Sequence, residues 1–242
     1  MTQPLFDNKD FFEKYKAVRH KEDGYNNLIE HPAMHALLPD LSGKAVLDMG
    51  CGFGYNCKSF ADAGATSVVG IDISQKMVYA ARELNAAPNL RFELLYMEEI
   101  HALGQKFDVI FSSMAMHYIA DFDFLVKQVY GALNDGGVFL FSQEHPMQTG
   151  GGSKWLSEEG DREGAIVSDY LRDGVRNEVW MEKERQIYHR SVSTIVNTLV
   201  ENGFAISKIV EPAPSENALA IAPKYYKEFH RPTALIVVAV KS

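Results

Sequence analysis

The sequence has few cysteines, no long apolar run and no excess of basic residues, and each absence excludes a class of protein. Two cysteines among 242 residues cannot form the disulfide framework of a small secreted domain, so the chain is typical of a reducing compartment. The longest aliphatic run, residues 234–240, is far too short to span a bilayer. No apolar segment follows basic residues near the N-terminus, so we expect no secretory signal.

The charge balance of the chain is acidic. The formal net charge is −8 at pH 7, which argues against an extended phosphate-binding surface, so nucleic acid is not an expected partner. Hydrophobic residues make up 46% of the chain and charged residues 23%, which suffices for a packed core and excludes global disorder. The sequence therefore predicts a soluble, cytoplasmic globular protein without a membrane segment.

Short apolar segments alternate with helix-prone segments along most of the chain. Apolar residues at helical spacing, such as Met77, Ala81 and Leu84, predict the helices. Runs of aliphatic and aromatic residues predict seven strands, over residues 44–48, 67–72, 90–95, 107–111, 137–141, 204–210 and 234–240. Strands that alternate with helices predict an α/β fold with a parallel sheet covered on both faces.

Two segments fall outside this alternation. Residues 1–40 are polar and helix-prone, and they predict an N-terminal helical cap. Residues 150–190 form a segment that is long for a plain loop and contains both tryptophans. We interpret residues 150–190 as an aromatic lid over the substrate, and a subunit or core contact is the alternative. The candidate substrate contacts in this segment are Trp155, Tyr170, Tyr188 and His189. Residues 1–242 are expected to form one domain, and its oligomeric state stays open, a homo-oligomer included.

A glycine-rich turn follows the first expected strand. Gly50, Gly52 and Gly54 alternate with other residues, and glycine lets a ligand lie directly against the backbone. A merely tight turn is the alternative, but three glycines cost stability, so we favour a ligand-binding turn. The dinucleotide fingerprint Gly-x-Gly-x-x-Gly is not met, because Tyr55 stands at its third glycine.

Two acidic residues accompany this turn. Asp48 lies two residues before the first glycine, where a carboxylate suits a ligand that carries a positive charge. Asp72 ends the second expected strand, where a carboxylate can accept hydrogen bonds from both ribose hydroxyls. A nucleoside with a cationic amino-acid tail meets both requirements.

With its loop, acid, strand order and spacing, the chain resembles the class I S-adenosylmethionine-dependent methyltransferases, most strongly over residues 44–146. Residues 112–119 (SSMAMHYI) and 141–146 (FSQEHP) are similar to a bacterial subgroup of small-molecule type without an agreed substrate. The resemblance implies a doubly wound, seven-stranded Rossmann-like sheet with its last strand antiparallel and a lid inserted after the fifth strand. It implies S-adenosylmethionine as the cofactor and S-adenosylhomocysteine as the product.

The resemblance also implies roles for individual residues. Ser113 or Met114 would face the sulfonium, and Tyr15 with Arg19 would close over the cofactor carboxylate, an exposed arginine being the alternative. The usual Asp after the third strand is absent, which puts the adenine contact in doubt. The remaining cofactor contacts would be Asp48, Gly50, Cys51, Gly52 and Gly54 for the methionine moiety, Asp72 and Ile73 for the ribose, and Met77, Met97 and Glu98 for the adenine.

Candidate catalytic residues follow the fourth and fifth expected strands. His117, Glu144 and His145 come after strands at the ligand-binding edge of such a sheet, although a structural histidine is the alternative. A base is needed only where the methyl acceptor starts protonated. We therefore expect methyl transfer to a small-molecule O, N or C nucleophile. An RNA methyltransferase and a sensor that binds S-adenosylmethionine without turnover are the alternatives.

Other motifs predict no further site. His31 and His35 have the spacing of helical metal ligands, but Pro32 lies between them and no third ligand is apparent, so we expect no metal. The sequence contains neither a Gly-x-Ser-x-Gly elbow nor a Walker lysine.

Overall fold

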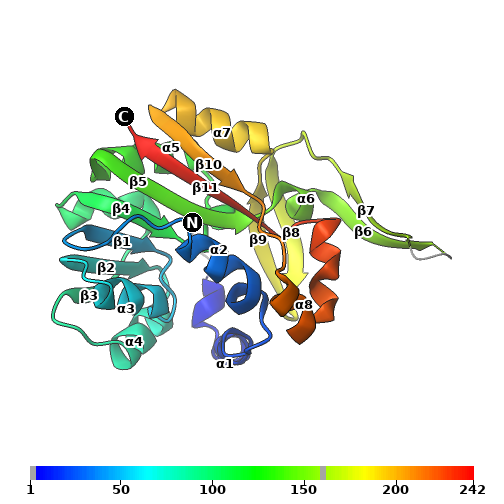
Figure 1. The fold of residues 1–242 in the computed structure, drawn as a ribbon, viewed down its shortest axis with the longest axis horizontal. Helices are drawn as coiled ribbons and strands as arrows, with labels where there is room; N and C mark the ends of the chain where they lie inside the picture. Colours follow the sequence, from blue (N-terminus) through cyan, green and yellow to red (C-terminus); the bar gives the residue numbers. More distant parts are fainter. Residues whose placement is uncertain (1–3, 159–161) are drawn as a thin grey trace.

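A seven-stranded sheet forms the centre of the protein (Figure 1). The computed structural model describes residues 4–158 and 162–242. The sheet has the order β10-β11-β5-β4-β1-β2-β3, and β11 runs antiparallel to β5 and β10 while the other pairs are parallel. The expected fold, with six strands in one direction and the last strand reversed, is confirmed. The strands are β1 (Ala45–Met49), β2 (Ser67–Asp72), β3 (Leu90–Leu94), β4 (Phe107–Ser112), β5 (Leu133–Glu144), β10 (Phe204–Val210) and β11 (Ala234–Lys241).

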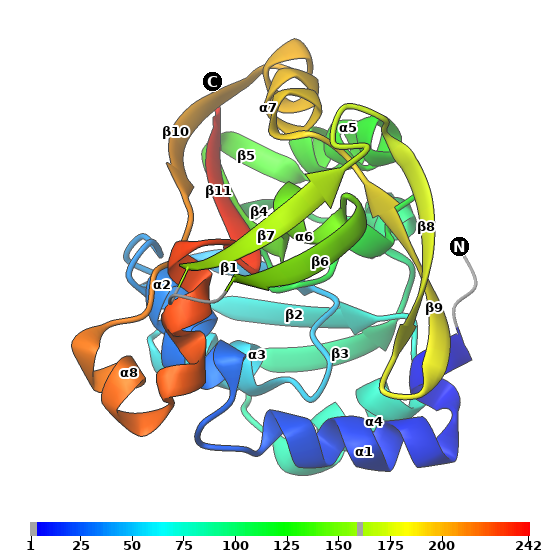
Figure 2. The ribbon, with the colours of Figure 1, turned by 90° about the vertical axis from the view of Figure 1, so that its right-hand side faces the viewer.

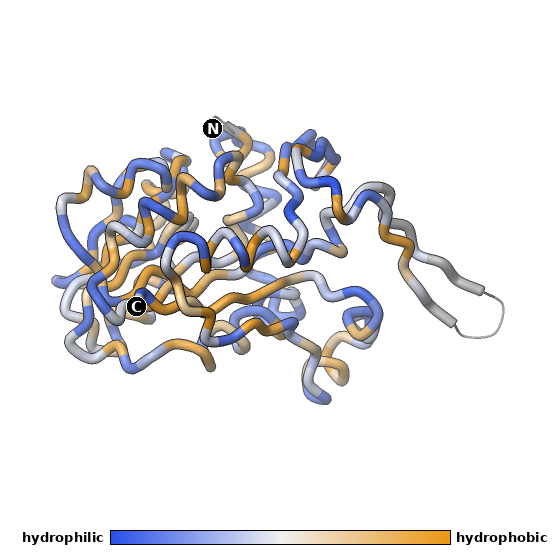
Figure 3. Tube along the Cα trace, turned by 90° about the horizontal axis from the view of Figure 1, so that it is seen from above, coloured by the Kyte–Doolittle hydropathy of each residue, from blue (hydrophilic) through white to orange (hydrophobic). Residues whose placement is uncertain are grey.

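Helices cover both faces of this sheet. Successive residues of the buried strands point to opposite faces, and both sets are apolar. Val46 of β1 belongs to the core that α3 and α4 complete, whereas the next residue, Leu47, belongs to the core that α5 and α7 complete. Figure 3 shows the hydrophobic residues concentrated along the central strands. Of the residues whose spacing predicted α4, Met77 and Ala81 are buried, whereas Leu84 at the end of the helix is half exposed.

Side-chain caps fix where several helices begin. Asn8, Ser74 and Ser191 each accept a hydrogen bond from the backbone three residues later, at the starts of α1, α4 and α7. No helix in the described residues is long and apolar enough to cross a membrane. In chain order the helices are η1 (Pro4–Asp7), α1 (Lys9–Arg19), η2 (Asn26–Glu30), α2 (His31–His35), α3 (Tyr55–Asp62), α4 (Gln75–Leu84), η3 (Met97–Leu103), η4 (Met116–Tyr118), α5 (Phe122–Ala132), α6 (Pro146–Thr149), α7 (Val192–Glu201), α8 (Glu216–Ile221) and η5 (Pro223–Phe229).

Residues 150–190 contain two antiparallel hairpins. The first, β6 (Gly151–Glu158) with β7 (Arg162–Ser168), extends away from the body of the protein (Figure 1). The second, β8 (Gly174–Trp180) with β9 (Lys183–His189), curves along the body and its tip reaches α1 (Figure 2). There Glu182 forms an ion pair with Lys14, and Trp180 packs edge-on against Phe11 and Tyr15. Residues 168 positions apart in the sequence, Lys14 and Glu182, therefore meet over the same edge of the sheet.

Candidate functional site

The glycine loop between β1 and α3 has a backbone that only glycine adopts readily. Gly50, Gly52 and Gly54 have φ angles of +73°, +53° and +77°. A β-carbon on Gly50 would lie 2.7 Å from Met97 Cε, and one on Gly54 would lie 2.6 Å from the Phe92 ring. A β-carbon on Gly52 would meet nothing within 4 Å. Two of the glycines therefore allow close packing, and the third leaves its backbone open to a ligand.

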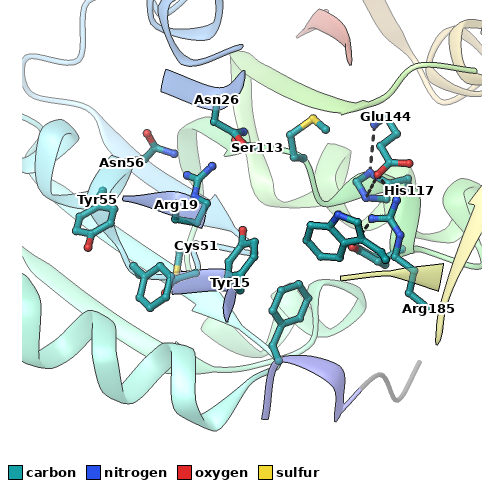
Figure 4. Close-up of a pocket in the computed structure, with 17 residues that line it drawn as sticks. Tyr15, Arg19, Asn26, Cys51, Tyr55, Asn56, Ser113, His117, Glu144 and Arg185 are labelled. Atoms are coloured by element: carbon teal, nitrogen blue, oxygen red, sulfur yellow. Dashed lines mark hydrogen bonds and ion pairs between the residues drawn. The ribbon is translucent and has the colours of Figure 1, made fainter. Parts of the chain in front are cut away.

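A cleft runs along the carboxyl ends of the parallel strands, above this loop. It has two adjoining halves, which we call the Asp72 half and the Arg19 half, and a junction whose residues line both. The junction consists of Phe6, Tyr15, Gly50, Gly52, Ser113, Met114 and Tyr118. The Asp72 half adds Asp72, Ile73, Met77, Leu95, Tyr96, Met97, Glu98, Ala115 and Ile119. The Arg19 half adds Arg19, Asn26, Cys51, Phe53, Tyr55, Asn56, His117, Glu144, Trp180 and Arg185 (Figure 4).

Asp72 is held by backbone hydrogen bonds at the end of β2. Its Oδ2 accepts from the N–H of Gly52 at 3.0 Å, and its Oδ1 accepts from the N–H of Ser74 at 2.8 Å. Burial raises the pKa of Asp72 to about 6, so the carboxyl group is ionised at neutral pH. Each oxygen of this carboxylate can accept a further hydrogen bond from a ligand in the cleft.

Asp48 lies beneath the glycine loop rather than in the cleft. Its side chain is buried and is absent from the lining of both halves, and the thiol of Cys57 donates to its Oδ2 at 3.3 Å. Burial raises the pKa of Asp48 to about 7. Of the predicted contacts in this loop, Gly50, Cys51 and Gly52 line the cleft, whereas Asp48 and Gly54 lie outside its lining.

Tyr15 and Arg19 of α1 both face the cleft. Tyr15 packs among aromatic rings, with its centroid 5.2 Å from Phe6 and 5.8 Å from Trp180. The guanidinium of Arg19 donates to Nε2 of His31 at 3.2 Å, and burial lowers the pKa of His31 to about 4, so this imidazole is neutral. Arg19 has no carboxylate within ion-pair distance among the described residues. Its positive charge therefore remains available to an anionic group.

A buried glutamate holds the segment that follows β4. Glu30 Oε1 accepts hydrogen bonds from the hydroxyls of Ser113 at 2.8 Å and Ser142 at 2.5 Å. The Ser142 hydroxyl in turn accepts from the N–H of Met114 at 2.8 Å, and Met114 has the unusual φ of +52°. Sequence reasoning missed Glu30, because nothing in its polar segment marks it as buried.

Glu144 belongs to a charged cluster at the outer end of the Arg19 half. The guanidinium of Arg185 donates to Glu144 Oε1 at 2.5 Å (Figure 4). It also donates to the Tyr118 hydroxyl at 3.1 Å and to Glu178. It also lies 4.7 Å from the ring centroid of Trp180. Two carboxylates share one guanidinium, so this cluster carries a net negative charge.

His117 lines the cleft in a form unsuited to accepting a proton. Its Nδ1 accepts from the backbone N–H of Glu144 at 3.2 Å, so the neutral ring carries its proton on Nε2. Burial, with the charges of Arg185 and Arg190, holds the pKa of His117 well below its usual range. The protonated Nε2 lies 3.7 Å from Glu144 Oε1, so neither ring nitrogen is a free basic site.

Several predicted site residues lie outside the lining of both halves. His145 caps α6, where its Nδ1 accepts from the N–H of Met147 at 3.0 Å and its Nε2 contacts Glu211 at 2.8 Å. Trp155 packs under Arg231, with 4.7 Å between the guanidinium and the ring centroid. His189 donates to the carbonyl of Tyr170, and the Tyr188 hydroxyl donates to Gln186. The insert contributes Trp180 and Arg185 to the cleft instead.

The described residues contain no cluster of three or more side chains that would hold a metal ion. The cleft itself combines the carboxylates of Asp72 and Glu144 with the guanidinium groups of Arg19 and Arg185, which suits an organic ligand with hydroxyl, cationic and anionic parts.

Comparison with known proteins gives the site a family context. A methyltransferase domain family matches residues 46–137. The chain is 36% identical to an uncharacterized protein of Haemophilus influenzae, over 98% of this chain and 96% of that one. The solved structure of an S-adenosylmethionine-dependent methyltransferase from Mesorhizobium loti superposes with a TM-score of 0.81 at 33% identity, covering 88% of this chain and 97% of that one. A tRNA U34 carboxymethyltransferase of Alcanivorax borkumensis is 42% identical over 41% of this chain and 32% of its own.

The burial of Asp48 predicts a pH-dependent cost to stability. Its pKa is about 7 in the folded chain and about 3.9 when unfolded. The group therefore favours folding at acidic pH, and that contribution is lost as pH rises through about 7. At pH 8 we expect Asp48→Asn to raise the free energy of unfolding by up to about 4 kcal/mol. Near pH 4 the free energy of unfolding should be the same in the variant and the parent.

Urea unfolding at the two pH values measures this difference. Asp135→Asn is the control, because the side chain of Asp135 is 95% exposed. This substitution should leave the free energy of unfolding unchanged at both pH values. An Asp48→Asn protein less stable than its parent at both pH values would show that the buried carboxylate stabilises the fold.

Proposed function

This chain belongs to the S-adenosylmethionine-dependent methyltransferases, and we propose that it transfers the methyl group to a small-molecule nucleophile held in the Arg19 half of the cleft. The single observation that carries the proposal is the Arg19 half itself. Beyond the junction it contains Glu144, Trp180 and Arg185, which are more groups than the cofactor tail requires. This extra polar and aromatic lining supports an acceptor site rather than a cofactor sensor.

The lining of the cleft fits each part of S-adenosylmethionine. The free lone pairs of Asp72 suit the two ribose hydroxyls, and the open backbone of Gly52 allows the ligand to approach closely. The unpaired cation of Arg19 suits the carboxylate of the amino-acid tail. The apolar side chains of Met77 and Met97 suit the purine, with Ile73 and Glu98 beside them in the same half.

When bound, the cofactor supplies a methyl group already activated by its sulfonium. The chain's main task is therefore to align the acceptor and to exclude water, which is worth ~7 kcal/mol or more in favourable cases. The network from Glu30 through Ser142 fixes the backbone of Met114 at the junction. The rings of Tyr15 and Trp180, from the cap and the insert, would cover the site from above.

The proton of a protonated acceptor would pass to Glu144 rather than to a histidine. His117 has no free basic nitrogen in this tautomer, and His145 does not line the cleft. Glu144 faces the cleft and holds its Oε1 on Arg185, and its other oxygen can accept a proton. The protonated Nε2 of His117, 3.7 Å from Glu144 Oε1, would help to hold this carboxylate in place.

An RNA acceptor is the second candidate, because the chain shares a local similarity with the tRNA U34 carboxymethyltransferase of A. borkumensis. The net charge of −8 and the acidic Glu144–Arg185–Glu178 cluster at the cleft speak for a small molecule instead.

Asp72 is expected to be essential for cofactor binding. Asp72→Ala removes the acceptor of two hydroxyl hydrogen bonds, so it should weaken S-adenosylhomocysteine binding by about 1.5–3 kcal/mol. Calorimetry measures the affinity, with Asp135→Ala as an exposed control, and NAD should not bind. Unchanged affinity in Asp72→Ala would remove Asp72 from the ribose site.

The two tryptophans provide a test of which hairpin covers the cleft. In Trp155→Phe the only tryptophan is Trp180, which lines the Arg19 half. Binding of S-adenosylhomocysteine should therefore change the fluorescence of Trp180. In Trp180→Phe the only tryptophan is Trp155, which packs against Arg231, and its emission should stay constant. An equal response from both variants would extend the lid to the β6–β7 hairpin.

The acceptor class can be tested with methyl-labelled S-adenosylmethionine. Label should enter the low-mass fraction of a metabolite extract, and Glu144→Gln should reduce transfer roughly 10²-fold or more while it still binds S-adenosylhomocysteine. Label that enters total RNA from the same cells and is released by ribonuclease would favour the RNA acceptor. Cofactor binding without transfer to either fraction would favour the sensor.

A further inference from the structure

Glu30 is a fully buried carboxylate that the proposed reaction does not use directly. It lies at the end of η2, and its accessible surface is 0%. Three side chains donate to it, the hydroxyls of Ser113 and Ser142 and the amide of Asn26 at 3.2 Å. A carboxylate removed from water is costly unless a positive charge compensates it.

No cation of the described residues neutralises Glu30 directly. Its only ion-pair contact in the described part of the chain is His31, 3.5 Å from Oε2. That imidazole is neutral, because burial lowers its pKa to about 4 and Arg19 donates to its Nε2. The guanidinium of Arg19 and the carboxylate of Glu30 both contact this neutral Nε2 rather than each other, and the guanidinium faces the cleft.

The negative charge of Glu30 acts at the junction of the two halves of the cleft. Ser113, which bonds Glu30 directly, lines both halves. Burial raises the pKa of Tyr15, another junction residue, and the charge of Glu30 contributes in the same direction. The rings of Phe6, Tyr15 and Tyr118 surround the same position and also favour a cation.

A sulfonium links the nucleoside of S-adenosylmethionine to its amino-acid tail. With the nucleoside in the Asp72 half and the tail in the Arg19 half, the sulfonium would lie at the junction. Resting on the proposed function, we propose that the charge of Glu30 makes this cleft selective for the sulfonium cofactor over its neutral thioether product. Methyl transfer removes the positive charge from sulfur and leaves Glu30 without its compensating cation. The product is then held less tightly than the cofactor, which favours exchange after each turnover.

The test compares two affinities in one isosteric variant. Glu30→Gln keeps an oxygen for both serine hydroxyls and removes the charge, while its amide nitrogen replaces the oxygen that accepts from the Asn26 amide. Calorimetry should show that S-adenosylmethionine binding weakens roughly tenfold or more while S-adenosylhomocysteine binding changes little. Sinefungin, which carries an ammonium in place of the sulfonium, should weaken in parallel with S-adenosylmethionine. Retained S-adenosylhomocysteine binding also shows that the variant is folded.

Two further variants separate charge from packing. Ser142→Ala disturbs the same network without removing a charge, so it should weaken both ligands by the same factor. Glu30→Asp keeps the charge and should keep the parental ratio of the two affinities. A ratio that shifts as much in Glu30→Asp as in Glu30→Gln, or that stays parental in Glu30→Gln, would overturn the inference and leave the proposed function intact. A parent that binds neither ligand would overturn both.

Discussion

The hydrogen bonds between the glycine loop and the end of β2 are the constraint on which the site depends. The N–H groups of Gly50 and Cys51 donate to the carbonyl of Ile71 at 2.8 and 2.9 Å, and the N–H of Gly52 donates to Asp72. These bonds require the left-handed backbone of the glycines, and they tie the ends of two neighbouring strands into one rigid surface. The cap, the segment after β4 and the β8–β9 hairpin are all arranged over that surface.

The sheet and the loop could be predicted from the sequence because their signals are local. Buried parallel strands appear as short apolar runs, and Asp48, the three glycines and Asp72 lie within 25 residues of one another.

The lining of the Arg19 half could not be predicted in this way. Arg185 reaches Glu144 across 41 residues, and Glu30 reaches Ser142 across 112, so only tertiary packing brings these groups together. Aromatic composition indicated a lid in residues 150–190, but it could not distinguish Trp180 from Trp155, because the course of each hairpin decides which ring faces the cleft.

Buried acidic groups are the second theme of the site. Asp48, Asp72 and Glu30 lie beneath or beside the cleft, and burial is the main cause that raises the pKa values of Asp48 and Asp72. Such an arrangement costs stability in the free protein and is retained where a positively charged ligand compensates it. The neutral imidazoles of His31 and His117 fit the same pattern, since their burial adds no positive charge that would compete with the ligand.

The β8–β9 hairpin reaches only one half of the cleft. Trp180 and Arg185 line the Arg19 half, whereas every residue of the Asp72 half lies before residue 120 in the chain. Substitutions or length changes in residues 174–189 can therefore reshape the Arg19 half, the proposed acceptor site, while the lining of the Asp72 half stays intact. With the acceptor placed as proposed, a lineage would adopt a new methyl acceptor by altering one hairpin, and a protein engineer would diversify that hairpin without rebuilding the Asp72 half.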